Sequence, residues 1–297
     1  MNAIEVRDLR KSYGDFEAVK GITFDVPEGS FFAFLGPNGA GKSTTISMIC
    51  SLLSPDSGEI SIFGQGPEVS RRDMGVIFQE NMLDPRLTVR ENVTVRGSMY
   101  GFGKDELAAK VQTALEDADA LEFADRPYGK LSGGQRRRAD IARALVHCPK
   151  ILLLDEPTAG LDPQTRKHIW NTVYELKRKG MTVFLTTHYM EEAAEADDIV
   201  IIDKGMIVAH GIPSVLKDSY CSDYMTVVPK DMASADRALS SAGSDHEMRG
   251  DSLFIRLRST KDAIPLIEML KDNIVSFEVR TGSLDDAFIA ITGDDFE

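Results

Sequence analysis

The sequence has 297 residues, of which 42% are hydrophobic and 27% are charged, and its formal net charge at pH 7 is −13. This hydrophobic content is sufficient for a packed core and excludes a largely disordered chain. The acidic balance argues against nonspecific binding to nucleic acids, so we expect no nucleic-acid partner.

The sequence contains no pattern typical of secretion or of membrane insertion. Its three cysteines, Cys50, Cys148 and Cys221, have no disulfide or metal-ligand spacing, which fits a reducing cytosol. The first residues lack the basic and apolar regions of a signal peptide, and no apolar run approaches about 18 residues. We therefore expect a cytoplasmic protein that acts at a membrane only through a partner.

Residues 3–26 alternate between apolar and polar side chains, which predicts antiparallel strands. Tyr13 precedes Gly14 at the turn between these strands. Its ring can stack on a flat ligand such as adenine, or it can pack locally within the turn.

The next stretch predicts a strand, a glycine-rich loop and a helix. An apolar run at residues 31–35 precedes a loop, here called the P-loop, which consists of Gly36, Pro37, Asn38, Gly39, Ala40, Gly41, Lys42, Ser43 and Thr44. The glycines allow backbone N–H groups to point at an anion, Lys42 adds a positive charge, and the Ser43 hydroxyl can hold Mg²⁺. The pattern therefore predicts a phosphate-binding site.

Gln79 follows an apolar strand at residues 75–78, and its amide oxygen can reach a metal or a water. From residue 87 the pattern becomes helical and interrupts the α/β alternation, with Thr88 as a helix cap and Glu91 three residues later. We expect an inserted helical subdomain over about residues 87–146.

Leu131 is followed by Ser132, Gly133, Gly134 and Gln135 at the start of a helix; Leu131–Gln135 is called the LSGGQ segment below. The Ser132 hydroxyl, the glycine amides and the helix dipole can form a second anion-binding corner. The alternative is an ordinary capped helix start. The following run, Arg136–Arg138, is expected to form a solvated helix face.

Residues 150–155 predict a buried parallel strand that ends in two acids, Asp155 and Glu156. Two carboxylates at such a position are costly without a nearby cation. Asp155 is suited to a Mg²⁺ shell, and Glu156 is suited to orient or deprotonate a water. The alternative is a purely structural pair.

A turn that ends at Asp162 precedes Pro163 at a predicted helix start. The following buried strand, residues 181–186, has His188 just past its carboxyl end. His188 is either structural or placed to hydrogen-bond a γ-phosphate or the attacking water.

Taken together, these motifs resemble the nucleotide-binding subunits of ABC transporters over about residues 3–217. We therefore expect an ABC ATPase domain that spans residues 1–217. The resemblance is carried by Gly36–Thr44, Gln79, Leu131–Gln135, Ile151–Glu156, Ala159–Asp162 and His188. It implies an α/β P-loop NTPase fold of the ABC ATPase type, with an antiparallel β subdomain and the helical insertion. It also implies an ATP hydrolase that uses ATP and Mg²⁺ to drive a separate transmembrane permease, and that lies on the cytoplasmic face of the membrane through this permease.

The resemblance assigns a role to each motif. Tyr13 stacks on adenine and the P-loop residues hold the phosphates. The metal contacts are Ser43, Gln79 and Asp155, and the catalytic group is Glu156, His188 and Gln79. In the family, Ser132, Gly133, Gly134 and Gln135 contact ATP bound to the opposite subunit, and Asp162 lies at the dimer contact. A homodimer or a heterodimer with a paralogue would then complete two sites.

The sequence at Glu156–Pro163 and Thr187–Glu192 resembles the drug-resistance branch of this family, which contains exporters of daunorubicin-type drugs, lipids, polysaccharides and sodium. Export rather than import rests on this resemblance alone. Ala139 and Asp140 depart from the branch, which more often has a large apolar residue and Glu; we give them no weight because they lie outside the nucleotide contacts. The alternative function is that of a soluble ABC ATPase in translation or DNA repair.

Residues 218–297 predict a second domain that is separate and acidic. They contain 8 Lys/Arg and 16 Asp/Glu and follow a βαββαβ pattern, a small α+β fold. A last helix is expected after Ser283, with Asp286 completing a capping box. The domain is either regulatory or a dimer contact, or it is a passive appendage.

Overall fold

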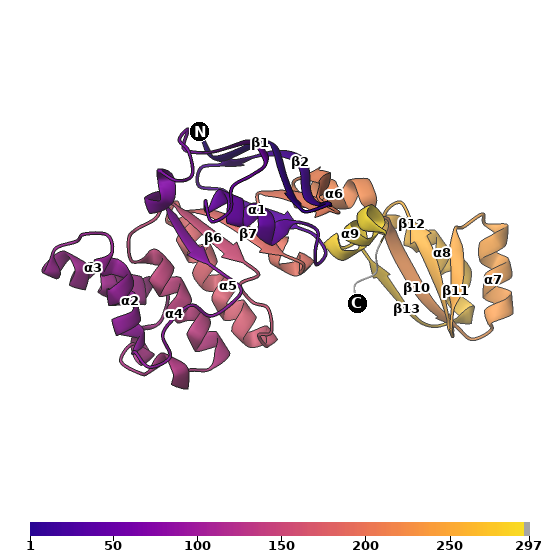
Figure 1. Ribbon diagram of the computed structural model, residues 1–297. Coiled ribbons are helices and arrows are strands. Elements are labelled where there is room, and N and C mark those ends of the chain that lie inside the picture. Colours follow the sequence, from indigo (N-terminus) through magenta and orange to yellow (C-terminus); the bar gives the residue numbers. More distant parts are fainter. Residues whose placement is uncertain (294–297) are drawn as a thin grey trace. The chain divides into compact units, whose positions relative to one another are not determined.

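The computed structural model describes residues 1–293, and the chain forms two compact units, Met1–Ile212 and Pro213–Glu297 (Figure 1). Each unit is described by itself. The division follows Ile212 rather than residue 217, because helix α6 (Pro213–Tyr220) packs against α9 (Leu284–Thr292) within the second unit.

The first unit is built on a six-stranded sheet with the order β5-β6-β7-β3-β8-β9. Neighbouring strands are parallel except for β9, which is antiparallel to β8. The strands are β3 (Phe31–Leu35), β5 (Met74–Ile77), β6 (Ile151–Asp155), β7 (Thr182–Thr187), β8 (Asp198–Asp203) and β9 (Met206–Gly211). Every residue of β3, β6 and β7 is buried, as their continuous apolar runs predict for a sheet covered on both faces.

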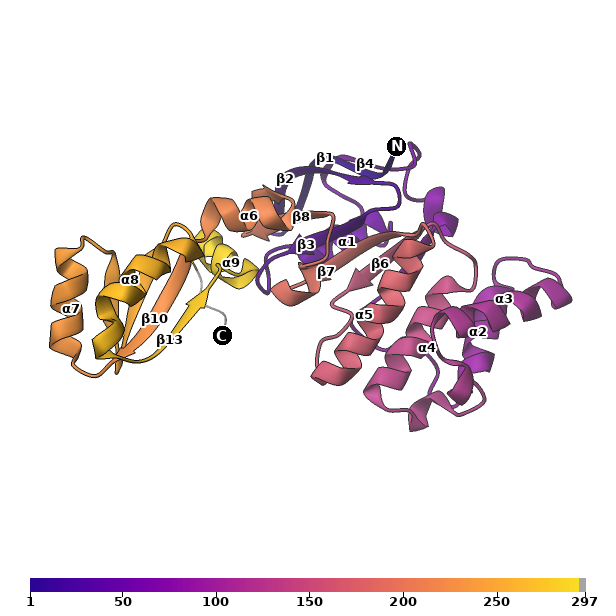
Figure 2. The same cartoon turned by 180° about the vertical axis from the view of Figure 1, so that it is seen from behind.

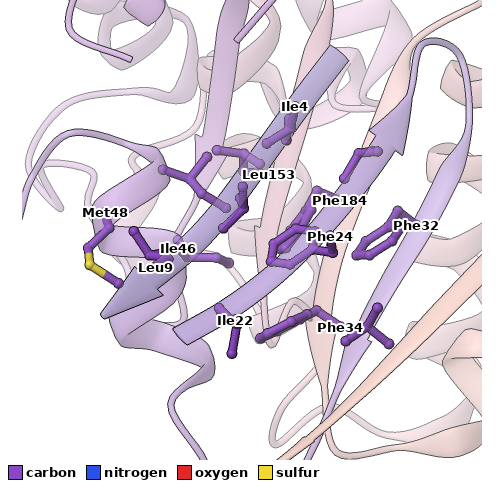
Figure 3. Close-up of a cluster of buried hydrophobic side chains, with 14 of the residues drawn as sticks. Ile4, Leu9, Ile22, Phe24, Phe32, Phe34, Ile46, Met48, Leu153 and Phe184 are labelled. Carbon is purple, nitrogen blue, oxygen red and sulfur yellow. The ribbon is translucent and has the colours of Figure 1, made fainter. Parts of the chain in front are cut away.

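A three-stranded antiparallel sheet with the order β2-β1-β4 packs against this central sheet. Its strands are β1 (Asn2–Tyr13), β2 (Phe16–Pro27) and β4 (Ser57–Ile62). Phe24 of β2 stacks on Phe32 and tilts against Phe34 and Phe184 of the central sheet, with ring centroids 5.4, 5.3 and 6.1 Å away (Figure 3). Ile46 of helix α1 (Lys42–Ile49) lies in the same cluster, so the core fixes the helix that follows the P-loop.

The expected helical insertion is present. It contains α2 (Val89–Ser98), α3 (Lys104–Asp117) and α4 (Gly133–Leu145), which pack on one another. The predicted capping box of Thr88 and Glu91 is confirmed at the start of α2. Helix α5 (Pro163–Arg178) follows β6, and the short 3-10 helices of this unit are η1 (Ser70–Asp73), η2 (Leu121–Phe123), η3 (Tyr128–Lys130) and η4 (Met190–Ala193).

The second unit has the expected βαββαβ order, followed by α9; Figure 1 labels its four strands, and Figure 2 shows the same unit from behind. Its sheet has the order β11-β12-β10-β13. The elements are β10 (Asp223–Pro229), α7 (Met232–Ser241), β11 (His246–Arg249), β12 (Ser252–Leu257), η5 (Thr260–Asp262), α8 (Ala263–Leu270), η6 (Lys271–Asn273) and β13 (Ile274–Arg280). Helices α7 and α8 pack on the buried side chains of β10 and β12, and the capping box of Ser283 and Asp286 is confirmed.

Within residues 1–293, none of the helices combines the length and the apolar composition that a bilayer span requires.

Candidate functional site

The P-loop joins the carboxyl end of β3 to the amino end of α1, and neighbouring strands restrict its shape. Gly41, the residue before α1, has φ +111°, and a Cβ there would lie 2.7 Å from the Ala18 carbonyl oxygen. A Cβ on Gly36 would lie 2.3 Å from the Ile202 carbonyl oxygen. The loop thus lies so close to β2 and β8 that both positions require glycine, which has no Cβ.

A cavity of about 550 Å³ opens over the P-loop, entirely within the first unit. Its lining brings together side chains from several strand ends. It is formed by Tyr13, Phe16, Ala18, Asn38, Gly39, Gly41, Lys42, Ser43, Thr44, Gln79, Glu156, Ala159 and His188. Ten of these were predicted from the sequence as site residues, while Phe16, Ala18 and Ala159 were not; Phe16, across the turn from Tyr13, is an exposed ring at the same mouth.

Lys42 is buried, with 4% of its surface exposed, and contacts both its own loop and Glu156. Its Nζ donates to the carbonyl oxygens of Gly36 at 2.8 Å and Pro37 at 3.1 Å, and lies 3.4 Å from Glu156 Oε1. Burial lowers the pKa of Lys42, while the nearby Glu156 carboxylate opposes this change.

Asp155 ends β6 beneath the P-loop. Its Oδ1 accepts a hydrogen bond from Thr186 Oγ1 at 2.5 Å, and this bond and the nearby Ser43 act to lower the pKa of the carboxyl. Burial raises the pKa of Asp155, as expected for a carboxylate withdrawn from water.

The oxygen donors near the P-loop fit Mg²⁺, which prefers hard ligands. They are the hydroxyl of Ser43, the carboxylate of Asp155 and the amide of Gln79. Magnesium is usually held by one or two carboxylates together with substrate phosphates. Among residues 1–293, the structure contains no cluster of three or more His, Cys, Asp or Glu side chains that could hold a metal ion.

Glu156 lies just past β6 in an unusual backbone conformation. Its φ is +44°, in the left-handed region that non-glycine residues rarely adopt, and its N–H donates to the Thr186 carbonyl oxygen at 3.0 Å. Its carboxylate lies between Lys42 and His188, with Oε2 3.4 Å from His188 Nδ1. This approach lacks hydrogen-bond geometry, since His188 Nδ1 is buried without a hydrogen-bond partner in the described structure. The pair is therefore close but not aligned.

The expectation of a solvated arginine face at Arg136–Arg138 is wrong for Arg137. This side chain is 5% exposed and points from α4 to the ends of β5 and β6. Its guanidinium donates to the carbonyl oxygens of Phe78 at 2.5 Å, Glu156 at 3.2 Å and Pro157. Helical spacing contained a signal for this: Arg137 shares a face with the buried Ile141 and Ala144, four and seven residues later.

Asp140, which we gave no weight in the sequence, is also buried, with 2% of its surface exposed. It accepts a hydrogen bond from Tyr128 Oη at 3.3 Å, and the same hydroxyl lies 3.1 Å from Asn81 Oδ1. Burial raises the pKa of Asp140 to about 6, against the attraction of Arg137 and Arg143. The residue is thus part of a buried polar network between α4 and the loop after β5.

Glu192 is a second functional candidate that the sequence did not reveal. It is 2% exposed and accepts hydrogen bonds from Thr187 Oγ1 at 2.5 Å and from Thr158 Oγ1. Thr158 follows Glu156 by two residues and Thr187 precedes His188. Glu192 therefore connects the segments that carry the two side chains facing each other in the cavity.

The LSGGQ segment forms the predicted helix start, and the structure shows that Ser132 and Gln135 make a capping box there. Gln135 N donates to Ser132 Oγ at 3.4 Å, and Ser132 N donates to Gln135 Oε1 at 3.2 Å. Asp162 caps α5 in a similar way by accepting from Thr165 N at 3.0 Å. A Cβ on Gly134 would lie 2.3 Å from Thr165 Cγ2, so the segment packs closely against α5.

In the described part of the chain, the cavity over the P-loop is lined without any residue of the LSGGQ segment. Ser132 and Gly133 are exposed instead. The structure thus brings Tyr13, Gln79, Glu156 and His188 to the P-loop but leaves the LSGGQ segment apart from them.

Comparisons with known proteins agree on the kind of protein that carries these motifs. Residues 19–159 match the family model described as ABC transporter. The chain is 38% identical over 297 residues to Nod factor export ATP-binding protein I from Burkholderia lata, covering 98% of this chain and 97% of that protein.

Two solved structures resemble the fold. One is cbiO1 from Clostridium perfringens, described as part of the ABC transporter complex cbiONQ, with a TM-score of 0.68, 31% identity, and coverage of 72% of this chain and 90% of that chain. The other is a dimeric ATP-binding cassette in a post-hydrolysis state bound to ADP and Pi, with a TM-score of 0.64, 30% identity, and coverage of 70% and 98%.

Proposed function

The chain belongs to the ABC transporter family as an ATP-binding subunit with ATPase activity, and we propose that it powers export of a drug, lipid or polysaccharide-like substrate through a separate membrane permease. The observation that carries this proposal is the cavity in which Lys42, Glu156 and His188 meet over the P-loop. The similarity of nearly the whole chain to a protein named for Nod factor export supports export over import, and makes such a factor the first substrate to test.

Each side chain in the cavity has a proposed task. The P-loop amides and Lys42 hold the phosphates, and Tyr13 stacks on the adenine. Ser43, Gln79 and Asp155 would hold Mg²⁺, which supplies neutralisation of phosphate charge.

Glu156 orients or deprotonates the attacking water, and His188 holds the γ-phosphate. Glu156 lies close enough to Lys42 for their charges to interact, with Oε1 3.4 Å from Lys42 Nζ. Phosphoryl transfer depends on positioning and charge rather than on covalent chemistry, and this arrangement provides both.

A second subunit is proposed to complete the site. The LSGGQ segment is exposed and does not line the cavity of its own chain, which supports its contact with ATP on an opposite subunit. A similar ATP-binding cassette is a dimer with ADP and Pi bound, which is a precedent for such an assembly. Two copies of this chain, or one copy and a paralogue, would meet with Asp162 near the contact.

The test of the catalytic assignment is Glu156→Gln. An amide cannot accept the proton of the water, so we expect ATP hydrolysis to fall by about 100-fold or more while ATP binding is retained and a dimer accumulates with ATP. Glu191→Gln, at an exposed carboxylate of the η4 segment, is the matched control. Wild-type turnover in Glu156→Gln would remove Glu156 from this role.

The proposed association with a permease is tested by purifying the tagged full-length chain from detergent-solubilised membranes. We expect a membrane protein to copurify in fixed proportion and to stimulate the ATPase activity of the chain. Salt-sensitive recovery of ribosomes or DNA in place of a membrane protein would contradict the proposal.

A further inference from the structure

Arg137 connects α4, called the LSGGQ helix because the LSGGQ segment forms its start, to the end of β6, where Asp155 and Glu156 lie. It is buried near the start of α4, and all its acceptors are backbone carbonyl oxygens: Nη1 donates to Phe78 at 2.5 Å, Nη2 to Glu156 at 3.2 Å and Asp155 at 3.3 Å, and Nε to Pro157. The first of these precedes Gln79, and the others are consecutive residues around Glu156. One side chain therefore holds the backbone at two places that face the cavity.

The backbone it holds is strained. Glu156 has φ +44°, and a non-glycine residue persists in this region only where its surroundings impose it. Its N–H is held by the Thr186 carbonyl oxygen of β7, and its carbonyl oxygen is held by Arg137 of α4. Loss of either contact would release the peptide groups that define this conformation.

That conformation sets the direction of the Glu156 carboxylate. Its two oxygens each lie 3.4 Å from a neighbour, Lys42 Nζ and His188 Nδ1. A change of about 1 Å in the position of a reacting group can lower a rate by about 100-fold. Only the planar guanidinium, with its fixed fork of donors, can reach all these carbonyl oxygens at once; a lysine ammonium at the same position cannot.

We propose that Arg137 is a positioning residue for Glu156, which ties the catalytic carboxylate of each chain to the LSGGQ helix of the same chain. In the proposed dimer, the LSGGQ segment contacts the nucleotide of the opposite subunit. Arg137 would then connect the two ATP sites, because a displacement of α4 at one site would reach Glu156 at the other. This inference rests on the proposed role of Glu156.

The experiment compares Arg137→Lys with Arg143→Lys in the full-length chain. Arg143 is on the same helix and donates to the Val76 carbonyl oxygen of β5 at 2.6 Å, two residues before Phe78 and away from the carboxylates. It therefore controls for replacing an arginine of α4 that donates to a backbone carbonyl oxygen of the sheet. The measurements are kcat and KM for ATP, thermal stability, and ATP-dependent dimer formation by light scattering in the Glu156→Gln background.

For Arg137→Lys we expect kcat to fall by about 10- to 100-fold with KM changed less than about twofold, and the Glu156→Gln dimer to form as before. Arg143→Lys is expected to share the loss of thermal stability but to keep its kcat. Equal kcat values in the two variants would overturn the proposal. Loss of the ATP-dependent dimer in Arg137→Lys/Glu156→Gln would also overturn it, because Arg137 would then act by maintaining the structure of the LSGGQ segment rather than by positioning Glu156.

Failure of this inference is distinguishable from failure of the proposed function. If Glu156→Gln alone hydrolyses ATP at the wild-type rate, the role of Glu156 is wrong, and with it the inference. If Glu156→Gln is inactive while Arg137→Lys turns over normally, only the role of Arg137 is wrong.

Discussion

Two buried ionisable side chains, one in α4 and one just after it, are expected to give the first unit opposing dependences of stability on pH. His147 is 8% exposed, its Nε2 lies 3.0 Å from the Met74 carbonyl oxygen, and its ring stacks on Tyr100 with centroids 4.3 Å apart. Burial lowers the pKa of His147 to about 4, whereas burial raises the pKa of Asp140 to about 6.

The sign of each contribution follows from which state binds the proton first. As pH falls from about 6.5, the unfolded chain protonates His147 while the folded protein does not, so stability is lost on acidification. With the pKa at about 4 in the folded state, this loss amounts to about 2 kcal/mol between pH 7 and pH 5. Asp140 has the opposite sign: the folded protein takes up the proton first, which adds about 1 kcal/mol of stability over the same interval.

The perturbation that separates the two is His147→Phe. A phenyl ring preserves the stacking on Tyr100 and cannot titrate. The lost hydrogen bond to the Met74 carbonyl oxygen lowers stability by about 1–3 kcal/mol, but by the same amount at every pH. Wild type should therefore lose its stability advantage over the variant by about 2 kcal/mol between pH 7 and pH 5.

The assay is urea unfolding followed by tryptophan fluorescence. Trp170 is the one tryptophan of the chain, lies in α5 and is 6% exposed, so its emission reports on the first unit alone. Dilute protein is needed near pH 5 because the isoelectric point is about 4.9. A difference between wild type and His147→Phe that stays constant from pH 7 to pH 5 would refute the reasoning, since His147 would then titrate alike in both states.

Four further variants, three substitutions and one truncation, test the packing of the first unit. Gly41→Ala adds a Cβ 2.7 Å from a carbonyl oxygen at a positive φ and should lower the free energy of unfolding by about 2–4 kcal/mol. Gly39→Ala has φ +81° but open space around it, so it should lower the free energy of unfolding by about 1–2 kcal/mol. Thermal melts that rank the two variants in the reverse order would contradict this reasoning. Thr158→Val removes a hydroxyl donor from the buried Glu192 and should lower the free energy of unfolding by about 1–3 kcal/mol in urea; an unchanged midpoint would count against that contact. A chain that ends at Ile212 should unfold cooperatively with native-like tryptophan emission, and a molten first unit would show that it depends on the second.

Local patterns predicted the P-loop, the parallel strands and the helix caps because each depends on neighbours in sequence. The capping boxes at Thr88, Ser132 and Ser283 are set by residues three apart. The second unit was expected to begin at residue 218, whereas in the structure it begins at Pro213 with helix α6. The sequence of a short helix such as α6 does not indicate which core the helix packs against.

The buried charges at the site had no comparable local signal. The acceptors of Arg137 lie 18 to 59 residues away along the chain, and only the sheet order brings them under α4. The Thr158 partner of Glu192 is 34 residues away. In the sequence, these side chains look like an arginine run and an acidic turn, and both patterns are typical of a solvated surface.

The place of β3 in the sheet has a consequence for how the protein becomes active during synthesis. This strand pairs with β7 and β8, so Leu35, which leads into the P-loop, lies beside Thr187 and Ile201. The loop before β3 is likewise bonded across 153 residues, from Gly29 N to Thr182 Oγ1. Contacts this distant in sequence form slowly and only after the later strands have left the ribosome, whereas the helical insertion has local contacts and can fold earlier. A nascent chain therefore carries its LSGGQ helix before it has a nucleotide site, and ATP can stabilise the first unit only once β8 has been added.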